Sequence, residues 1–225
     1  MEVLTRRAAS EAVFDVGWRF ILGELRTEVL VPSLAVAVDV AGAAAGEAGD
    51  GSLRLDLRHD RVLMALREPA AVGVTARQTG LAHRVSAAVA RLGLATVPGV
   101  ESERATQILE IAIDAMDIAA VRPFWKAVMG YTDETDDAGP TGPLVDPWGQ
   151  GPAIWFQQMD KPRPQRNRIH FDVSVPHDEK DRRIRAALDA GGRLVYDAEA
   201  PAFVVLADVE GNEACVTTWL GRDAS

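Results

Sequence analysis

A stretch in which polar and apolar residues alternate strictly, together with a similar stretch 60 positions earlier, constrains the fold of this chain more than any other feature. In residues 168–174 every second side chain is apolar, a period of two that predicts a strand with one buried face and one polar face. Residues 109–114 show the same alternation, and Glu110 stands where His170 stands in the later stretch. A repeated structural unit is therefore predicted.

The same offset holds beyond these two strands. It pairs Trp155 with Cys215, and Gly151 with Gly211, without a gap. Helices are predicted after each alternating stretch, at residues 119–130 and 179–191. The second half of the chain should therefore contain two copies of a unit in which a strand is followed by a helix and then by further strands.

The first 94 residues predict a smaller α+β domain with the order helix, two strands, helix, two strands, helix, built on four antiparallel strands. Ser33 is predicted to begin one helix as its N-cap, and Thr75 with Gln78 forms a capping-box pattern at the start of another. Strands are expected at residues 17–24, 25–31, 52–57 and 61–66. Residues 95–105 include Pro98-Gly99 and charged positions, which is typical of a connection between domains, so the second domain is placed at 106–221.

Composition excludes several classes of partner. The 225 residues carry a formal net charge of −9, which disfavours nucleic acid and anionic membranes. The single cysteine, Cys215, allows no internal disulfide, in agreement with a reducing compartment. No apolar run approaches the ~20 residues of a membrane helix, and the first ten residues lack the apolar core of a secretory signal. We therefore expect a cytoplasmic protein.

The first domain resembles pterin-4a-carbinolamine dehydratases over residues 10–93, through Arg61-Val62 with the strand that follows and through Thr75-Ala76-Arg77-Gln78. In that family a His-His-Pro run and a further histidine bind and protonate the pterin. The equivalent positions here hold no imidazole and are Gly51, Ser52, Leu53 and Pro69. Dehydration requires a group that titrates near neutral pH, so dehydratase activity is not expected. Pterin binding without dehydration stays open as an alternative.

The second domain resembles the vicinal-oxygen-chelate superfamily, the glyoxalase, bleomycin-resistance and extradiol-dioxygenase group. The likeness is carried by residues 111–114, 124–131, 169–173 and 208–213. The resemblance implies two βαβββ modules that form an open cup around a ligand. In metal-dependent members, the ligands come from the first and last strands of each module, which the internal offset places at Glu110, Trp155, His170 and Cys215.

This implied metal-ligand set is depleted, because Trp155 cannot ligate and Cys215 replaces the usual carboxylate. Glu110, His170 and Cys215 would suit zinc if the thiol lost its proton, whereas hard divalent ions prefer oxygen donors. We therefore expect no metal cofactor, with zinc as the alternative. In the simpler interpretation Glu110 and His170 hydrogen-bond to each other, and Cys215 is a small buried apolar residue.

The polar face of the predicted strands also supplies candidate ligand-binding residues, since an apolar wall with a few converging polar groups is typical of a pocket. Trp155 could stack on a flat ring, and Gln157 and Thr217 could orient polar substituents. The complete candidate set is Glu110, Asp114, Trp155, Gln157, His170, Asp172, Cys215 and Thr217.

Two functions stay open at this point. In the first, the chain is a metal-independent small-molecule-binding protein, or an isomerase or lyase in which His170 and Glu110 transfer a proton. In the second, neither domain is catalytic, and the chain sequesters a ligand as resistance proteins do, with the first domain as a dimerisation scaffold. A homodimer is expected in either case, because the family that the first domain resembles is commonly oligomeric.

Overall fold

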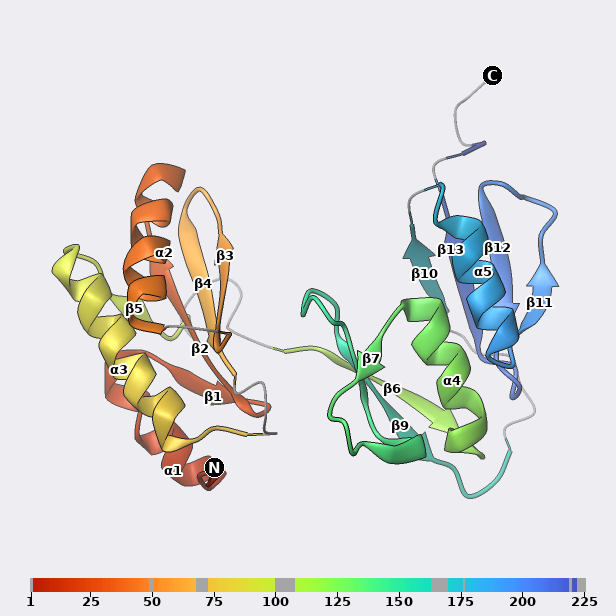
Figure 1. Ribbon diagram of the computed structural model, residues 1–225, viewed down its shortest axis with the longest axis horizontal. Helices are drawn as coiled ribbons and strands as arrows, with labels where there is room; N and C mark the ends of the chain where they lie inside the picture. Colours follow the sequence, from red (N-terminus) through yellow and green to blue (C-terminus); the bar gives the residue numbers. More distant parts are fainter. Residues whose placement is uncertain are drawn as a thin grey trace. The chain divides into compact units, whose positions relative to one another are not determined.

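The computed structural model describes residues 2–48, 51–67, 73–99, 108–162, 170–175, 177–218 and 220–221 (Figure 1). The chain divides into two compact units, Met1–Ile108 and Leu109–Ser225. Each unit has a hydrophobic core of its own. Both units combine helices with sheets, which confirms the prediction of a mixed α+β fold.

The first unit is an antiparallel sheet covered by helices. Its strands run in the order β1-β2-β4-β3, and β5 pairs with Glu28 and Val29 of β2, beyond the residues that pair with β1. The elements are α1 (Arg6–Glu11), η1 (Phe14–Val16), β1 (Arg19–Ile21), β2 (Glu24–Leu30), α2 (Leu34–Ala48), β3 (Leu53–Leu57), β4 (Arg61–Leu66), α3 (Ala76–Arg91) and β5 (Thr96–Val97).

Local sequence signals explain most of these elements. The Ser33 hydroxyl accepts a hydrogen bond from the Val36 amide at the start of α2, and Thr75 and Gln78 form the predicted capping box of α3. Strand β5 was not predicted, and it lies in the segment interpreted as a connection. Two residues are too few to show a periodic pattern.

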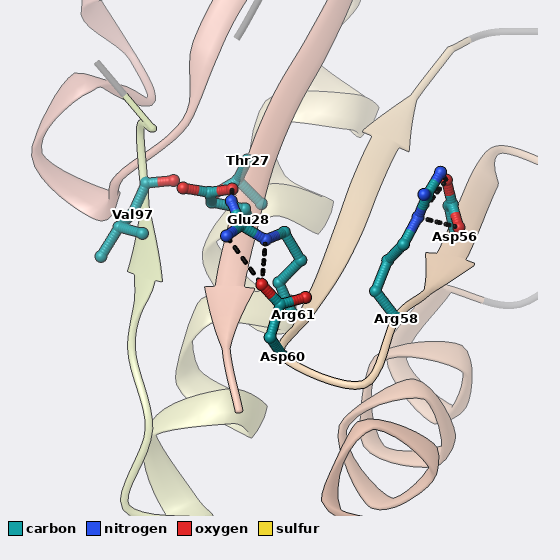
Figure 2. Close-up of polar contacts among 7 residues, drawn as sticks. All are labelled: Thr27, Glu28, Asp56, Arg58, Asp60, Arg61 and Val97. Carbon is teal, nitrogen blue, oxygen red and sulfur yellow. Dashed lines mark hydrogen bonds and ion pairs between the residues drawn. The ribbon is translucent and has the colours of Figure 1, made fainter. Parts of the chain in front are cut away.

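The sheet face that points away from the core of the first unit is lined by ion pairs. Glu28, only 6% exposed, is paired with Arg61 at 3.1 Å, and Arg61 also binds Asp60 at 2.8 Å. The hydrogen bond from Arg61 holds the pKa of Asp60 below its usual range. Figure 2 shows these contacts beside the separate pair Arg58–Asp56. The charges on this face are thus matched by close partners.

The second unit contains two modules of the same build. Each has a four-stranded sheet whose first and last strands pair in parallel, in the orders β6-β9-β8-β7 and β10-β13-β12-β11. The first module comprises β6 (Glu110–Ala115), α4 (Ile118–Met129), β7 (Thr132–Asp133), η2 (Gly139–Thr141), β8 (Leu144–Val145) and β9 (Ala153–Gln158). The second module comprises β10 (Phe171–Ser174), α5 (Lys180–Asp189), β11 (Arg193–Tyr196), β12 (Phe203–Ala207) and β13 (Glu213–Thr217).

The strand register confirms the predicted repeat residue by residue. Ala112 lies opposite Trp155 in the first module, and Asp172 lies opposite Cys215 in the second. Both members of one pair are 60 positions from both members of the other. The part of the predicted strand before residue 170 lies outside the described residues.

The turns before β9 and β13 have the same build but differ in length. In each turn an aspartate accepts backbone hydrogen bonds from the second and fourth residues after it, Asp146 in the first module and Asp208 in the second. The glycine three positions after each aspartate has a positive φ, 66° at Gly149 and 93° at Gly211. Gly149 is therefore the counterpart of Gly211, and the predicted pairing of Gly151 with Gly211 is wrong because the first turn is two residues longer.

The two modules share one core. Phe124 and Trp125 of α4, Ala187 of α5 and Leu206 of β12 are all fully or almost fully buried in it. The Trp125 ring meets Phe171 edge to face, with ring centroids 5.6 Å apart. Trp125 is only 1% exposed. None of the helices in the described ranges has the length and apolar character needed to cross a bilayer.

Candidate functional site

The candidate site lies on one face of the sheet of the second module. Backbone pairing places Asp172 opposite Cys215, Cys215 opposite Val205, and Val205 opposite Tyr196. Directly paired residues of a sheet share a face, so these four side chains form one row across the sheet. The neighbouring residue Ala214 enters the core on the opposite face.

His170 extends this row into a cluster of three donor groups. It stands two positions before Asp172 and therefore lies on the same face. Its Nε2 is 3.6 Å from Oδ1 of Asp172. One ligating atom each of His170, Asp172 and Cys215 lies within 4.8 Å of the others. We refer to these three residues as the His170 cluster.

Exposure differs within the His170 cluster. Cys215 is 6% exposed, whereas the side chains of His170 and Asp172 are 52% and 63% exposed. The thiol thus lies at the base of the cluster, and the imidazole and carboxylate reach solvent. A small molecule can approach the cluster from the solvent side.

The strands on the far side of β13 add an aromatic pair to the same face. The Tyr196 ring stacks on the Phe203 ring, with centroids 6.0 Å apart and an interplanar angle of 26°. Phe203 lies opposite Thr217, whose hydroxyl is 2.8 Å from that of Ser174. Tyr196 is 42% exposed. The face therefore has polar groups at one end and stacked aromatic rings at the other.

Sequence reasoning did not include Tyr196 or Phe203 among the candidates. The register shifts between Leu194 and Tyr196, so the alternation along β11 is interrupted. A period-two pattern cannot assign a face across such a bulge. The aromatic character of the two residues was visible, but their common face was not.

The remaining predicted residues lie on the sheet of the first module. Asp114 is opposite Gln157, and Ala112 is opposite Trp155, which is 37% exposed. Glu110 is the first residue of β6 and is exposed. The predicted set is thus divided between two sheets, with His170, Asp172, Cys215 and Thr217 together on one of them.

Glu110 is not a member of the His170 cluster. His170 contacts Asp172, and within the described residues no hydrogen bond joins His170 to Glu110. Asp172 is therefore the carboxylate that lies beside His170 among the described residues. In the first module Ala112 is equivalent to Asp172, and Trp155 is equivalent to Cys215. Neither Ala112 nor Trp155 offers a donor for a cation.

Comparison with known proteins agrees with this architecture. Residues 110–217 match the family model described as "Glyoxalase-like domain". The matched segment begins at the first residue of β6 and ends at the last residue of β13. This part of the chain is therefore similar to a glyoxalase-like domain. The match does not extend into the first unit, so the pterin-dehydratase resemblance stays a prediction.

The solved structures that are similar to this chain cover about half of it. A glyoxalase/bleomycin resistance protein/dioxygenase family enzyme from Burkholderia phytofirmans is 20% identical, with a TM-score of 0.39, and the alignment covers 49% of this chain and 97% of that one. A glyoxalase/dioxygenase from Nostoc punctiforme is 15% identical, with a TM-score of 0.41 and coverages of 53% and 92%.

A third structure is a mutant fosfomycin resistance protein, FosX, from Listeria monocytogenes, complexed with Mn(II) and a dihydroxypropylphosphonic acid. It is 10% identical, with a TM-score of 0.40 and coverages of 53% and 96%. Similarity at this level does not assign an activity. Among curated proteins, no match to this chain was found.

Proposed function

We propose that the glyoxalase-like domain binds a small molecule on the face of the second module, between the His170 cluster and the Tyr196–Phe203 pair. The observation that carries this proposal is the common face of these two groups. Binding sites for small molecules combine apolar and aromatic walls with a few placed polar groups. Here an exposed imidazole and carboxylate can orient polar atoms, and the aromatic pair can contact an apolar part of the ligand.

A second candidate function is proton transfer by His170, as an isomerase or lyase requires. The supporting observation is that the half-exposed imidazole has a carboxylate neighbour, Asp172, 3.6 Å away. A carboxylate beside a histidine can orient the ring and stabilise the imidazolium that forms when the ring accepts a proton. This chemistry needs no metal ion. Glu110 was expected to assist His170, and its contribution stays to be tested by Glu110→Gln.

Binding is tested with a panel of small carboxylates, phosphonates including fosfomycin, and aromatic acids, on protein freed of metal by chelation. We expect at least one compound to raise the melting temperature. Tyr196→Ala and Asp172→Asn should weaken its affinity by about 10-fold or more. His59→Gln, an exposed histidine in the first unit, is the matched control and should bind as the wild type does. Equal affinity in all four proteins would place the ligand elsewhere.

The same compounds decide between catalysis and sequestration. If a bound compound is converted, His170→Gln should lower its turnover by roughly 10²- to 10⁴-fold while its affinity changes little. Stoichiometric binding without any conversion would support the sequestering protein instead. Loss of affinity and turnover together in Glu110→Gln would return Glu110 to the site.

Two further expectations concern the first unit. We propose that the protein is a homodimer, supported by the apolar exposed side of α2, where Leu34 and Val38 are 54% and 55% exposed. Light scattering of the full chain should give twice the monomer mass, and a monomer at micromolar concentration would refute this. Pterin binding without dehydration is the alternative for the first unit. It predicts that a pterin raises the melting temperature by several degrees, and the absence of any shift would dismiss it.

A further inference from the structure

We propose that the second module alone forms a binding site for a divalent cation of the zinc type, with His170, Asp172 and Cys215 as three ligands and a fourth position open to solvent. The proposed metal site lies on the same sheet face as the proposed small-molecule site. It rests on the proposed function only through this shared location. It differs in one residue from the set expected from the sequence, because Asp172 takes the place of Glu110.

The backbone of two neighbouring strands holds the three donors together. Asp172 and Cys215 are directly opposite in the parallel pairing of β10 with β13. His170 lies two residues earlier in the chain, on the same face as Asp172. Phe171 and Ala214, on the opposite face, pack in the shared core and hold the strands in place. Strand register therefore brings Asp172 and Cys215 together, and His170 lies directly before β10.

The distance between His170 and Asp172 favours a common cation over a direct hydrogen bond. Their closest atoms are 3.6 Å apart, which is longer than the 2.7–3.2 Å typical of an N–H···O hydrogen bond. Zinc binds nitrogen and oxygen at about 2.0–2.2 Å with tetrahedral angles, so two such ligands lie about 3.4 Å from each other. The imidazole and carboxylate already have nearly the spacing of two ligands on one ion.

The chemistry of the donors selects the ion. An imidazole nitrogen, a carboxylate oxygen and a thiolate sulfur suit zinc, whereas magnesium and manganese prefer oxygen ligands. Cys215 would bind as the thiolate, and its proton is released when the ion binds. Solvent exposure of His170 and Asp172 leaves room for a fourth ligand from water or from a bound molecule.

The sequence led us to expect no metal because only one ligand position was considered in the first strand and one in the last strand of each module. Asp172 was outside that set, because the ligand positions implied by the family resemblance are Glu110, Trp155, His170 and Cys215. A cation held at Nε2 of His170 would occupy the lone pair that proton transfer needs at that nitrogen. Cation binding and the use of this nitrogen as a base therefore exclude each other.

The test is a calorimetric titration of the full chain with zinc chloride. The protein is first reduced and treated with a chelator, and no small molecule is present. We expect one zinc per chain. Asp172→Asn, His170→Gln and Cys215→Ser should each weaken binding by at least about 100-fold, more than the loss of an outer-shell contact. Glu110→Gln and the control His59→Gln should bind as the wild type does. Circular dichroism verifies that each variant is folded.

Cobalt(II) supplies a second measurement. The wild-type protein should develop a near-ultraviolet thiolate-to-cobalt absorption band, and Cys215→Ser should lack it. The proposal is overturned if no saturable binding occurs, if Asp172→Asn binds as tightly as the wild type, or if Glu110→Gln weakens binding as much as Cys215→Ser does. These outcomes leave the proposed small-molecule binding untouched, because that binding is measured on metal-free protein.

Discussion

The indole Nε1 of Trp125 donates a hydrogen bond to Oδ2 of Asp208 at 3.0 Å, and the two residues belong to different modules. Asp208 is fully buried. Its other hydrogen bonds come from the Glu210 amide and from the backbone and side-chain nitrogens of Asn212. One carboxylate therefore shapes the turn between β12 and β13 and also holds this turn against α4.

Asp208→Asn should destabilise the second unit by about 2–3 kcal/mol. The substituted amide keeps the size of the side chain but turns one acceptor into a donor, which then faces other buried N–H groups. Urea unfolding followed by tryptophan fluorescence measures the loss. Trp125→Phe is the matched variant, because it removes one donor and leaves the turn intact, and it should cost about 1 kcal/mol. Wild-type stability of Asp208→Asn would show that the turn tolerates an amide.

Glu210 connects the same turn to the start of α4. Its carboxylate oxygens accept hydrogen bonds from the Met116 and Asp117 amides at 2.8 Å and 2.6 Å. Glu210→Gln replaces one acceptor by a donor and removes a negative charge near the helix N-terminus, so we expect a loss of about 1 kcal/mol in the free energy of unfolding. Asp197→Asn, at an exposed position, is the control, and an equal effect of the two substitutions would contradict the capping role.

Asp133 should make stability depend on pH. Hydrogen bonds from Lys126 and Arg122 hold the pKa of Asp133 below its usual range. A carboxylate with a lowered folded-state pKa stabilises the fold above its unfolded pKa of about 3.9, and this contribution is lost as the pH falls through the folded value. Because the Asp133 side chain is 38% exposed, solvent screening limits the effect to about 1 kcal/mol at pH 7.

Asp133→Asn should therefore be less stable than the wild type at pH 7, and the difference should shrink as the pH falls below about 4. Chemical unfolding at a series of pH values measures it. Asp136→Asn, an exposed residue of the same loop, serves as the control. A difference that stays constant down to pH 2 would mean that the Asp133 charge does not stabilise the fold.

The end of the first unit can be tested with two fragments, residues 1–94 and 1–105. The shorter fragment lacks β5, where the Val97 carbonyl accepts a hydrogen bond from Thr27 and the Thr96 hydroxyl lies 2.8 Å from Val16 O (Figure 2 shows Thr27 and Val97). Since each net hydrogen bond contributes about 1 kcal/mol, the longer fragment should be more stable by about 2–4 kcal/mol. Equal unfolding midpoints would place the boundary at residue 94.

Much of the architecture could be predicted from the sequence because it depends on local periodicity. A strand turns successive side chains to opposite faces, so the alternation around His170 indicated which residues share its face. The 60-residue offset indicated the repeat, and the capping residues Ser33 and Thr75 marked helix starts that the structure confirms. Each of these signals involves residues close in the chain or a regular spacing.

The composition of the site was decided only by the tertiary structure. Periodicity put Glu110 and Asp172 on equivalent polar faces, but strand pairing determined that Asp172 lies beside His170 and Cys215. The bulge in β11 determined that Tyr196 joins that face, and the packing of α4 brought Trp125 to Asp208 across 83 positions of sequence. Such contacts depend on how whole elements pack, and no local pattern of polar and apolar residues encodes them.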